Sequence, residues 1–218
     1  DSRVEMKKVH VDGESLATGI ATAVVDANVE ELAAYVVHDL DSKESKKRLR
    51  QVSKQIVIPI NKHSLYYVTA RDLGYFLKPR EGRSKITWMK EDGIVLIDVS
   101  DTKAVMEEYP LKKSNILASV HTVWVFEPLA PIGEIPQTAV TFTTRVDTGG
   151  NIPTAAANYN AKHFLSTVSD LRKKFDQSKE VDIYKRLKIV KQMGDLDRVQ
   201  AEIFAKRFMD VEKAQKVN

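Results

Sequence analysis

Hydrophobic residues recur along the chain with two different periods, and each period predicts a different kind of element. Between residues 28 and 40 they stand three or four positions apart, which predicts an amphipathic helix with Asn28 as its N-cap. Elsewhere before Gly149 they alternate with polar residues or form β-branched runs, which is typical of strands. We expect strands at 4–11, 18–26, 53–61, 65–72, 85–90, 94–100, 115–126 and 138–147.

Turn-forming residues separate most of these strands and limit how the strands can be connected. Clusters of Gly, Pro, Asn and Asp lie at 61–63, 78–82, 91–93 and 128–136. Such short connections leave no room for helical crossovers, so we expect an antiparallel sheet. The charged segment 41–51 is expected to be a short helical connection. This order of elements predicts an α+β fold in which a long helix lies across a strongly bent sheet.

Helical spacing returns after Pro153, and the helix that begins there opens with small residues. Thr154, three alanines at 155–157 and Ala161 precede the apolar side chains of Phe164 and Leu165. Small residues either let a helix lie close against a neighbouring backbone or leave room for something that is not protein. The residues alone leave both explanations open.

A second helical part follows this helix. Apolar residues between 183 and 193 form one helical stripe, and another begins at Leu196. Gly194 is a candidate C-cap and Asp195 a candidate N-cap between them. We therefore expect a domain over residues 1–176 and a helical hairpin over residues 177–218.

The net charge of +4 is unevenly distributed. Residues 1–170 hold 21 Lys and Arg against 22 Asp and Glu, whereas residues 171–218 hold 13 against 8. A nucleic-acid-binding domain should carry its basic stripe on the fold itself, so we expect no nucleic-acid partner. A basic helical tail suits an anionic membrane or an acidic protein partner, or it forms a solvated helix face.

The sequence offers few groups suited to catalysis or metal binding. The absence of cysteine excludes disulfides and thiolate chemistry and suits a reducing compartment. The five histidines lack ligand spacing, and there is neither a phosphate-cradling glycine loop nor a G-x-S-x-G elbow. No apolar run approaches the roughly 20 residues of a membrane span, and no signal peptide is visible. We expect a cytoplasmic, non-enzymatic protein without metal or cofactor, which contacts membranes peripherally and transiently.

Four stretches, in order, resemble motifs of the START domain, the lipid-transfer family related to the steroidogenic acute regulatory protein. They are VVDANVEELAAYVVHDL at 24–40, KPRE at 78–81, ILASVHTVWVFEPL at 116–129, and VDTGGNIP followed by NYNAK within 146–162. They resemble the family's strand-to-helix transition, its Pro-Arg-Asp segment, its strand ending in Glu-Pro-Leu, and its turn into the C-terminal helix. The resemblance spans about residues 4–176.

The resemblance implies a helix-grip fold, in which a curved antiparallel sheet wraps around the long C-terminal helix and encloses a tunnel for one lipid. The helix would be a lid whose small residues border the tunnel, with close packing as the alternative. The sequence departs from the family pattern in three places. Glu81 stands where the family's Pro-Arg-Asp segment has Asp, and residues 82–84 are expected to delay the next strand. The family's N-terminal helix is absent or clipped. The acidic–basic pair of sterol-binding members corresponds to positions near Tyr67 and Ile86, so the resemblance does not extend to that pair. The expected ligand is one amphipathic lipid, a phospholipid, a sphingolipid or a sterol.

Strand alternation and helical spacing predict which side chains would face the tunnel. The predicted ligand-binding residues are Tyr67, Thr69, Ile86, Trp88, Ala118, Val120, Thr122, Trp124, Phe142, Ala157, Asn158, Ala161 and Leu165. For the aromatic residues, core packing is the alternative. Thr69, Thr122 and Asn158 are candidate contacts for a lipid headgroup, because a buried polar group needs a partner. Arg80 is expected to form a structural ion pair.

Three functions compete at this point. The first is a module that sequesters one amphipathic lipid, because burying apolar surface is favourable without covalent chemistry. The second is a regulatory START-like domain of a larger protein, acting on a partner through its C-terminal helices. The chain lacks an initiator Met, which suggests a piece of a longer chain or a processed one. An enzyme on the same scaffold ranks last.

Overall fold

The computed structural model describes residues 3–9, 16–40, 42, 52–72, 77–150, 152, 154–194, 200 and 203. The chain divides into two compact units, Asp1–Asp176 and Gln177–Asn218. In the part of the chain that the structure describes, the first unit is an antiparallel sheet with two helices, and the second contains one helix. Of the described helices, none is long and apolar enough to cross a membrane.

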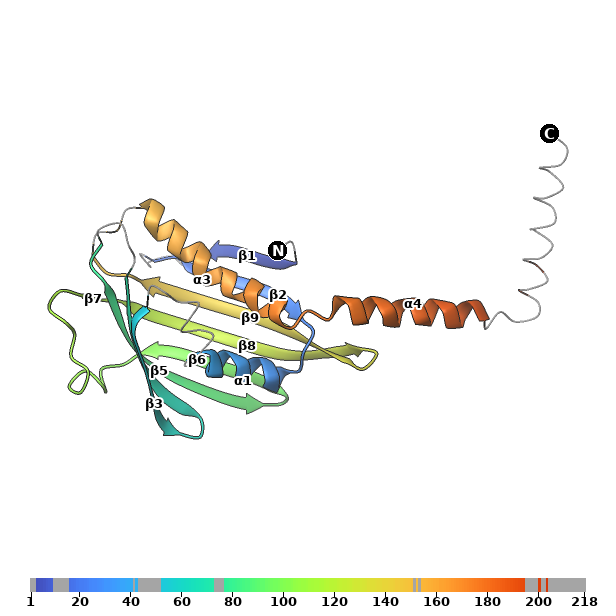
Figure 1. Ribbon diagram of the computed structural model, residues 1–218, viewed down its shortest axis with the longest axis horizontal. Helices are drawn as coiled ribbons and strands as arrows, with labels where there is room; N and C mark the ends of the chain where they lie inside the picture. The colour runs from blue at the N-terminus through green and yellow to red at the C-terminus, as the bar shows by residue number, and fades with distance from the viewer. Residues whose placement is uncertain are drawn as a thin grey trace. The chain divides into compact units, whose positions relative to one another are not determined.

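The sheet has nine strands in the order β1-β2-β9-β8-β6-β5-β4-β3, with β7 paired to β5 (Figure 1). Their bounds are β1 Val4–Val9, β2 Thr18–Val25, β3 Val52–Asn61, β4 Ser64–Arg71, β5 Arg80–Glu91, β6 Ile94–Asp101, β7 Ile116–Leu117, β8 Ser119–Ile132 and β9 Ile135–Asp147. All pairings are antiparallel except the short one between β5 and β7. The antiparallel sheet and the α+β fold class are as predicted.

Helix α1, Val29–Asp39, begins where the sequence predicts. Asn28 is extended, and its side-chain Oδ1 accepts a hydrogen bond from the backbone N–H of Glu31 at 2.8 Å. This bond satisfies one of the free donors of the first turn. At the other end, the Gln55 side-chain amide donates to the carbonyl of Leu40, so β3 holds the C-terminus of α1.

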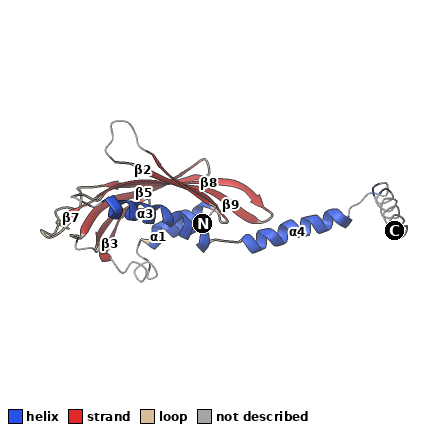
Figure 2. Cartoon of the chain, turned by 90° about the horizontal axis from the view of Figure 1, so that it is seen from above, coloured by secondary structure: helices blue, strands red, loops and turns tan. Residues whose placement is uncertain are grey.

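Helix α3, Thr154–Lys174, packs on the same side of the sheet as α1 (Figure 2). Leu165 lies so close to β2 that a Cβ added to Gly19 would stand 3.0 Å from its Cδ2 atom. The ring of Tyr35 in α1 packs edge to face against that of Phe175, the residue after α3, with centroids 5.3 Å apart. The buried side chains of the two helices and those of the sheet form one hydrophobic core. We call this side of the sheet the inner face.

The turn into α3 depends on two glycines and one arginine. Gly149 and Gly150 have φ of 61° and 65°, a conformation that L side chains rarely adopt. Arg80 is buried and donates from Nε to Thr148 O at 2.9 Å, from Nη2 to Gly149 O at 3.1 Å, and from Nη1 to Lys78 O. The expected structural role of Arg80 is therefore present, but its partners are backbone carbonyls and not the carboxylate of an ion pair.

Two strand boundaries predicted from the sequence are wrong. Strand β5 begins at Arg80, so only Lys78 and Pro79 of the predicted break 78–82 precede the strand, and residues 82–84 do not delay it. Strand β8 continues past Pro128 to Ile132, and only Gly133 and Glu134 separate it from β9. In both places the neighbouring strand continues the pairing, so tertiary context outweighs the turn propensity of Gly and Pro.

A third difference concerns the predicted strand 115–126, which is two strands. Ile116–Leu117 pairs with β5, and the chain resumes at Ser119 to pair with β6 and β9. By contrast, the predicted turn at 91–93 is confirmed, because Asp92 and Gly93 have φ of 49° and 82°, as in the two-residue turn that suits a β-hairpin.

The second unit contains helix α4, Ser178–Gly194, which includes the predicted first stripe. Several of its large apolar side chains are exposed, and Leu187, Val190 and Met193 are more than 60% exposed. The predicted second helix, from Asp195 on, and the predicted connection at 41–51 lie outside the described residues, apart from Ser42 and the isolated helical positions 200 and 203.

Candidate ligand-binding site

The register of the strands brings residues from five strands into rows on the inner face. One row runs through Trp88, Ile97, Trp124, Phe142 and Ala21. The next row runs through Ile86, Val99, Thr122, Thr144 and Gly19. Tyr67 lies opposite Ser84 and Thr69 opposite Gly82, on the same face as Ile86 because strand side chains alternate. Apart from Ala118, the predicted strand residues thus share one face of the sheet.

Burial divides these residues into two groups. Ile86, Trp124, Phe142 and Leu165 are nearly inaccessible and belong to the hydrophobic core. Tyr67, Thr69, Trp88 and Val120 are only half-buried, and the rings of Tyr67 and Trp88 pack against the edge of that core. The first group does what core residues do, whereas the second retains accessible surface on the inner face.

The buried group is held together by aromatic packing. Trp124 stacks on Phe126 with ring centroids 5.8 Å apart and lies tilted against Phe142 at 4.4 Å. Phe126 is fully buried and was not among the predicted site residues. Its position could have predicted it, since Phe126 follows Trp124 by two residues and therefore lies on the same face of the strand.

Thr122 finds a polar partner within the protein. Its Oγ1 lies 2.8 Å from Oγ1 of Thr144 on the adjacent strand, and both residues are buried. One hydroxyl donates and the other accepts, so the pair keeps one O–H donor and spare lone pairs for a further contact. A headgroup contact for Thr122 thus stays a prediction, but burial alone does not require one.

Four predicted residues lie elsewhere or are only partly described. Ala118 lies between β7 and β8, is half-buried, and donates its backbone N–H to the carbonyl of Glu81 at 2.8 Å. Ala157, Asn158 and Ala161 belong to α3, as predicted, but their side chains lie outside the described part of the structure.

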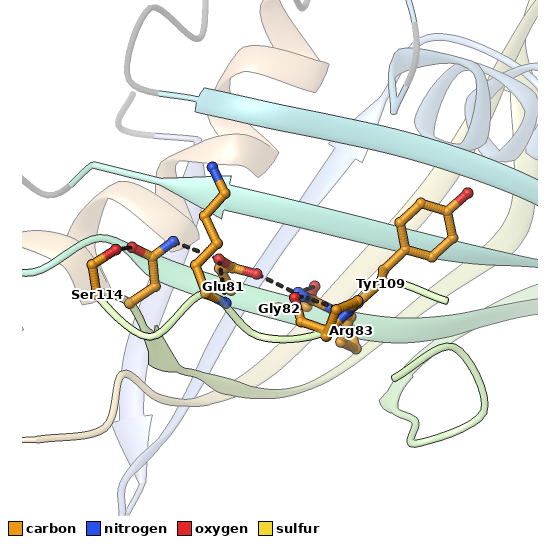
Figure 3. A network of polar contacts seen from close by, with 8 residues as sticks. Glu81, Gly82, Arg83, Tyr109 and Ser114 are labelled. Atoms are coloured by element: carbon orange, nitrogen blue, oxygen red, sulfur yellow. Dashed lines mark hydrogen bonds and ion pairs between the residues drawn. The ribbon is translucent and has the colours of Figure 1, made fainter. Parts of the chain in front are cut away.

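Sequence reasoning missed a buried ion pair on the opposite, outer face of the sheet. Glu81 and Arg83 are each 1% exposed at the side chain, and Arg83 Nη2 donates to Glu81 Oε2 at 2.6 Å (Figure 3). Arg83 also donates to the carbonyl of Tyr109 from Nε at 2.9 Å, and Asn115 donates to Glu81 Oε1. The pair thereby holds the segment between β6 and β7 against β5.

The environment of Glu81 keeps it ionised. Burial is the largest single influence and favours the neutral acid, but hydrogen bonds from Arg83 and Asn115, the charge of Arg83 and the N–H of Lys112 together lower the pKa of Glu81 below its ordinary value. Because Glu81 and Arg83 face away from Ile86 along β5, they do not line the inner face. They are no substitute for an acidic–basic pair inside a tunnel.

Between Ile86 and Gly19, and between Trp88 and Ala21, the two rows carry no charged side chain. Charged residues border them on the same face, since Lys8 lies opposite Gly19 and Asp101 opposite Ser84. Among the described residues, no group of His, Asp and Glu could hold a metal ion. The part of the face that these two rows cover suits an apolar ligand with neutral polar groups, since an ionised group there would meet no opposite charge within the rows.

The fold resembles those of several solved structures. The human StarD13 (DLC2) lipid transfer and protein localization domain aligns with a TM-score of 0.63 and 16% identity, covering 80% of this chain and 85% of that one. The STAR-related lipid transfer protein from Xanthomonas axonopodis aligns with a TM-score of 0.63 and 17% identity, covering 81% and 96%. The chain has a START-domain fold.

Other comparisons agree with this assignment of the fold or add nothing to it. Human STARD10 aligns with a TM-score of 0.63 and 17% identity, covering 79% of this chain and 68% of that one. No protein-family model matches the sequence, and no curated protein matches it either. The START fold places the helix of the C-terminal motif, α3, across the sheet, as the resemblance implied.

Proposed function

We propose that the first unit is a non-catalytic module that binds one lipid between the inner face of the sheet and its helices. The observation that carries the proposal is the group of half-buried residues Tyr67, Thr69, Trp88 and Val120, which lie beside a packed core on the inner face. The START fold and the lipid-transfer proteins that share it support the same function.

Burial of hydrocarbon supplies enough free energy for this function without covalent chemistry. Each buried methylene contributes about 0.8 kcal/mol, so about ten methylenes contribute about 8 kcal/mol, which corresponds to a micromolar dissociation constant. A neutral hydroxyl or carbonyl near the headgroup could use the spare donor of the Thr122–Thr144 pair.

The two tryptophans provide a direct test. Trp88 is half-buried and Trp124 is 5% exposed, and both lie on the inner face. A lipid with brominated acyl chains quenches tryptophan only on close approach. We expect it to quench Trp88 strongly in the Trp124→Phe protein, and Trp124 weakly in the Trp88→Phe protein. Native mass spectrometry of the unmodified protein should also show a co-purified lipid.

The opposite results would contradict the proposal. If labelled lipid binds while neither tryptophan is quenched, the lipid lies elsewhere on the protein. If neither protein binds lipid although both remain folded, the START fold of this chain serves another purpose. Met89→Phe is a matched control, because Met89 is the exposed neighbour of Trp88 on the outer face and should change nothing.

A regulatory role through the second unit is the alternative that a specific observation favours. Helix α4 exposes Leu187 and Val190 beside the basic residues Lys185, Arg186 and Lys188. We propose that it makes peripheral contact with an anionic cytoplasmic membrane surface, or binds a protein partner. Vesicle sedimentation at low and high salt tests the membrane contact. Equal binding to neutral and anionic vesicles would exclude an electrostatic contribution.

A further inference from the structure

An open groove of about 480 Å³ lies at the tips of two hairpins, on the surface of the first unit. Its walls come from the turn between β5 and β6, the hairpin of β8 and β9, and the start of α1. The volume falls within the range of about 300–1,000 Å³ that is common for ligand sites. None of the residues predicted to bind lipid lines it.

The apolar part of the groove is rigid. It is lined by Pro128, Pro131 and Pro136, together with Leu129 and Val29. Proline has a fixed φ angle, so these walls lose little conformational freedom when something binds. Leu129 is 44% exposed, which leaves its side chain available to an apolar group.

Gln137 supplies an amide to the groove. The residue is 7% exposed, and its Nε2 donates to Pro136 O at 3.0 Å. Its Oε1 and the second N–H of its amide form no hydrogen bond with any described residue. An amide with one free donor and one free acceptor is complementary to a peptide group, which offers the same pair in reverse.

The charge of the groove is negative. Among its lining residues, Lys90 is paired with Glu30, whereas Glu134 forms no ion pair with any described residue. The turn beside Lys90 adds Glu91 and Asp92, both exposed. Such a site repels anionic lipid surfaces and nucleic acids, and it attracts lysine or arginine.

We propose that this groove binds a peptide segment of a partner protein in which an apolar side chain is flanked by lysine or arginine. The apolar side chain packs on Leu129 and the prolines, Gln137 pairs with the peptide backbone, and Glu134 pairs with the flanking cation. The groove is independent of the lipid site, so either can exist without the other.

Fluorescence anisotropy of the full chain with short labelled peptides tests the proposal. A peptide of alternating lysine and leucine should bind, whereas peptides of lysine and serine or of glutamate and leucine should bind much more weakly. Glu134→Lys should weaken binding of the lysine–leucine peptide about tenfold, the equivalent of 1.4 kcal/mol. Gln137→Met, which keeps the side-chain volume, should weaken it with a smaller change in salt dependence.

Glu127→Lys is the matched control, since Glu127 is exposed on the same hairpin but does not line the groove. It should change the affinity less than about threefold, through long-range charge alone. Equal losses for Glu134→Lys and Glu127→Lys would mean nonspecific attraction and would overturn the proposal. Equal affinity for the lysine–leucine and lysine–serine peptides would also overturn it. A concentration-dependent dimer that Glu134→Lys dissociates would do so as well, since the groove would then bind a second copy of this chain.

Discussion

The buried pair of Glu81 and Arg83 makes a quantitative prediction about stability. Replacing Arg83 by Met keeps most of the side-chain volume but removes the hydrogen bond to Glu81 and those to the carbonyls of Tyr109, Gly82 and Pro110. The dominant cost is the buried carboxylate that is left without its cation. Breaking a buried pair in this way costs about 3–5 kcal/mol, so Arg83→Met should lose that much stability at neutral pH.

Replacing Glu81, the other member of the pair, should cost less stability than Arg83→Met. Glu81→Gln keeps an oxygen that can accept from Asn115 and from Lys112 N, and Arg83 keeps its carbonyl partners. Since a hydrogen bond to a charged group contributes about 1.5–3 kcal/mol, we expect a loss of about 2 kcal/mol. The double variant should be less destabilised than the sum, because the second change removes a group that the first left unpaired.

Acidification should reduce the difference between the wild type and Arg83→Met. In the wild type the pKa of Glu81 is lowered on folding, so its stabilising contribution is present above the ordinary carboxyl pKa and is lost as pH falls through the folded value. In Arg83→Met, burial should instead raise the pKa of Glu81, because the lowering effect of Arg83 is lost. As the pH falls below this raised pKa, protonation removes the unpaired buried charge. The variant then gains stability relative to the wild type.

Urea unfolding, followed by tryptophan fluorescence at neutral and mildly acidic pH, measures these quantities. Two results would refute the reasoning: a loss below about 1 kcal/mol for Arg83→Met at neutral pH, which is far under the range for a broken buried pair, or a deficit that does not shrink on acidification. Lys90→Met is the control, because Lys90 forms an exposed pair with Glu30 and should cost less than about 1 kcal/mol.

Three further predictions concern helix α3, the second unit and the turn into α3. Ala161→Trp should abolish lipid uptake and leave the melting temperature nearly unchanged if the small residues of α3 border a cavity, whereas a large drop in melting temperature would show that they pack against the sheet. A chain ending near Ser178 should still take up fluorescent lipid, and a folded truncation that binds none would place the second unit in the lipid site. Gly149→Ala should lower stability by more than about 1 kcal/mol, because the φ of Gly149 is 61° and the added Cβ would stand 2.9 Å from Leu117 O. Gly194→Ala is the control and should cause no such loss, because no atom lies within 4 Å of the added Cβ. Thermal unfolding compares the two variants.

The periodicity of the sequence determined the types of most elements and the faces of the strands. Alternation predicted that Val120, Thr122 and Trp124 share a face, and the same argument placed Phe142 on it. Local patterns suffice here because the pairing of β8 with β9 runs without a register shift from Ser119 to Leu129, so side chains alternate with a period of two. The cap of α1 at Asn28 was equally predictable, since capping involves only residues three positions apart.

Tertiary structure alone decided where charged and turn-forming residues could continue a strand. Glu81–Arg83 resembles a loop in sequence, yet it lies within β5, because Tyr109 and Asn115 approach from about 30 residues away and satisfy its charges. Pro128 likewise continues β8, because β9 folds back beside it at Thr138.

The sequence also did not determine which residues of the inner face are fully buried and which are half-buried. Trp88 and Trp124 have the same residue type and face the same side of the sheet, but one is half-buried and the other is enclosed by Phe126 and Phe142. Alternation tells which way a side chain points and carries no information on what lies in front of it. That depends on where α1 and α3 cross the sheet, which is set by packing between residues far apart in the chain.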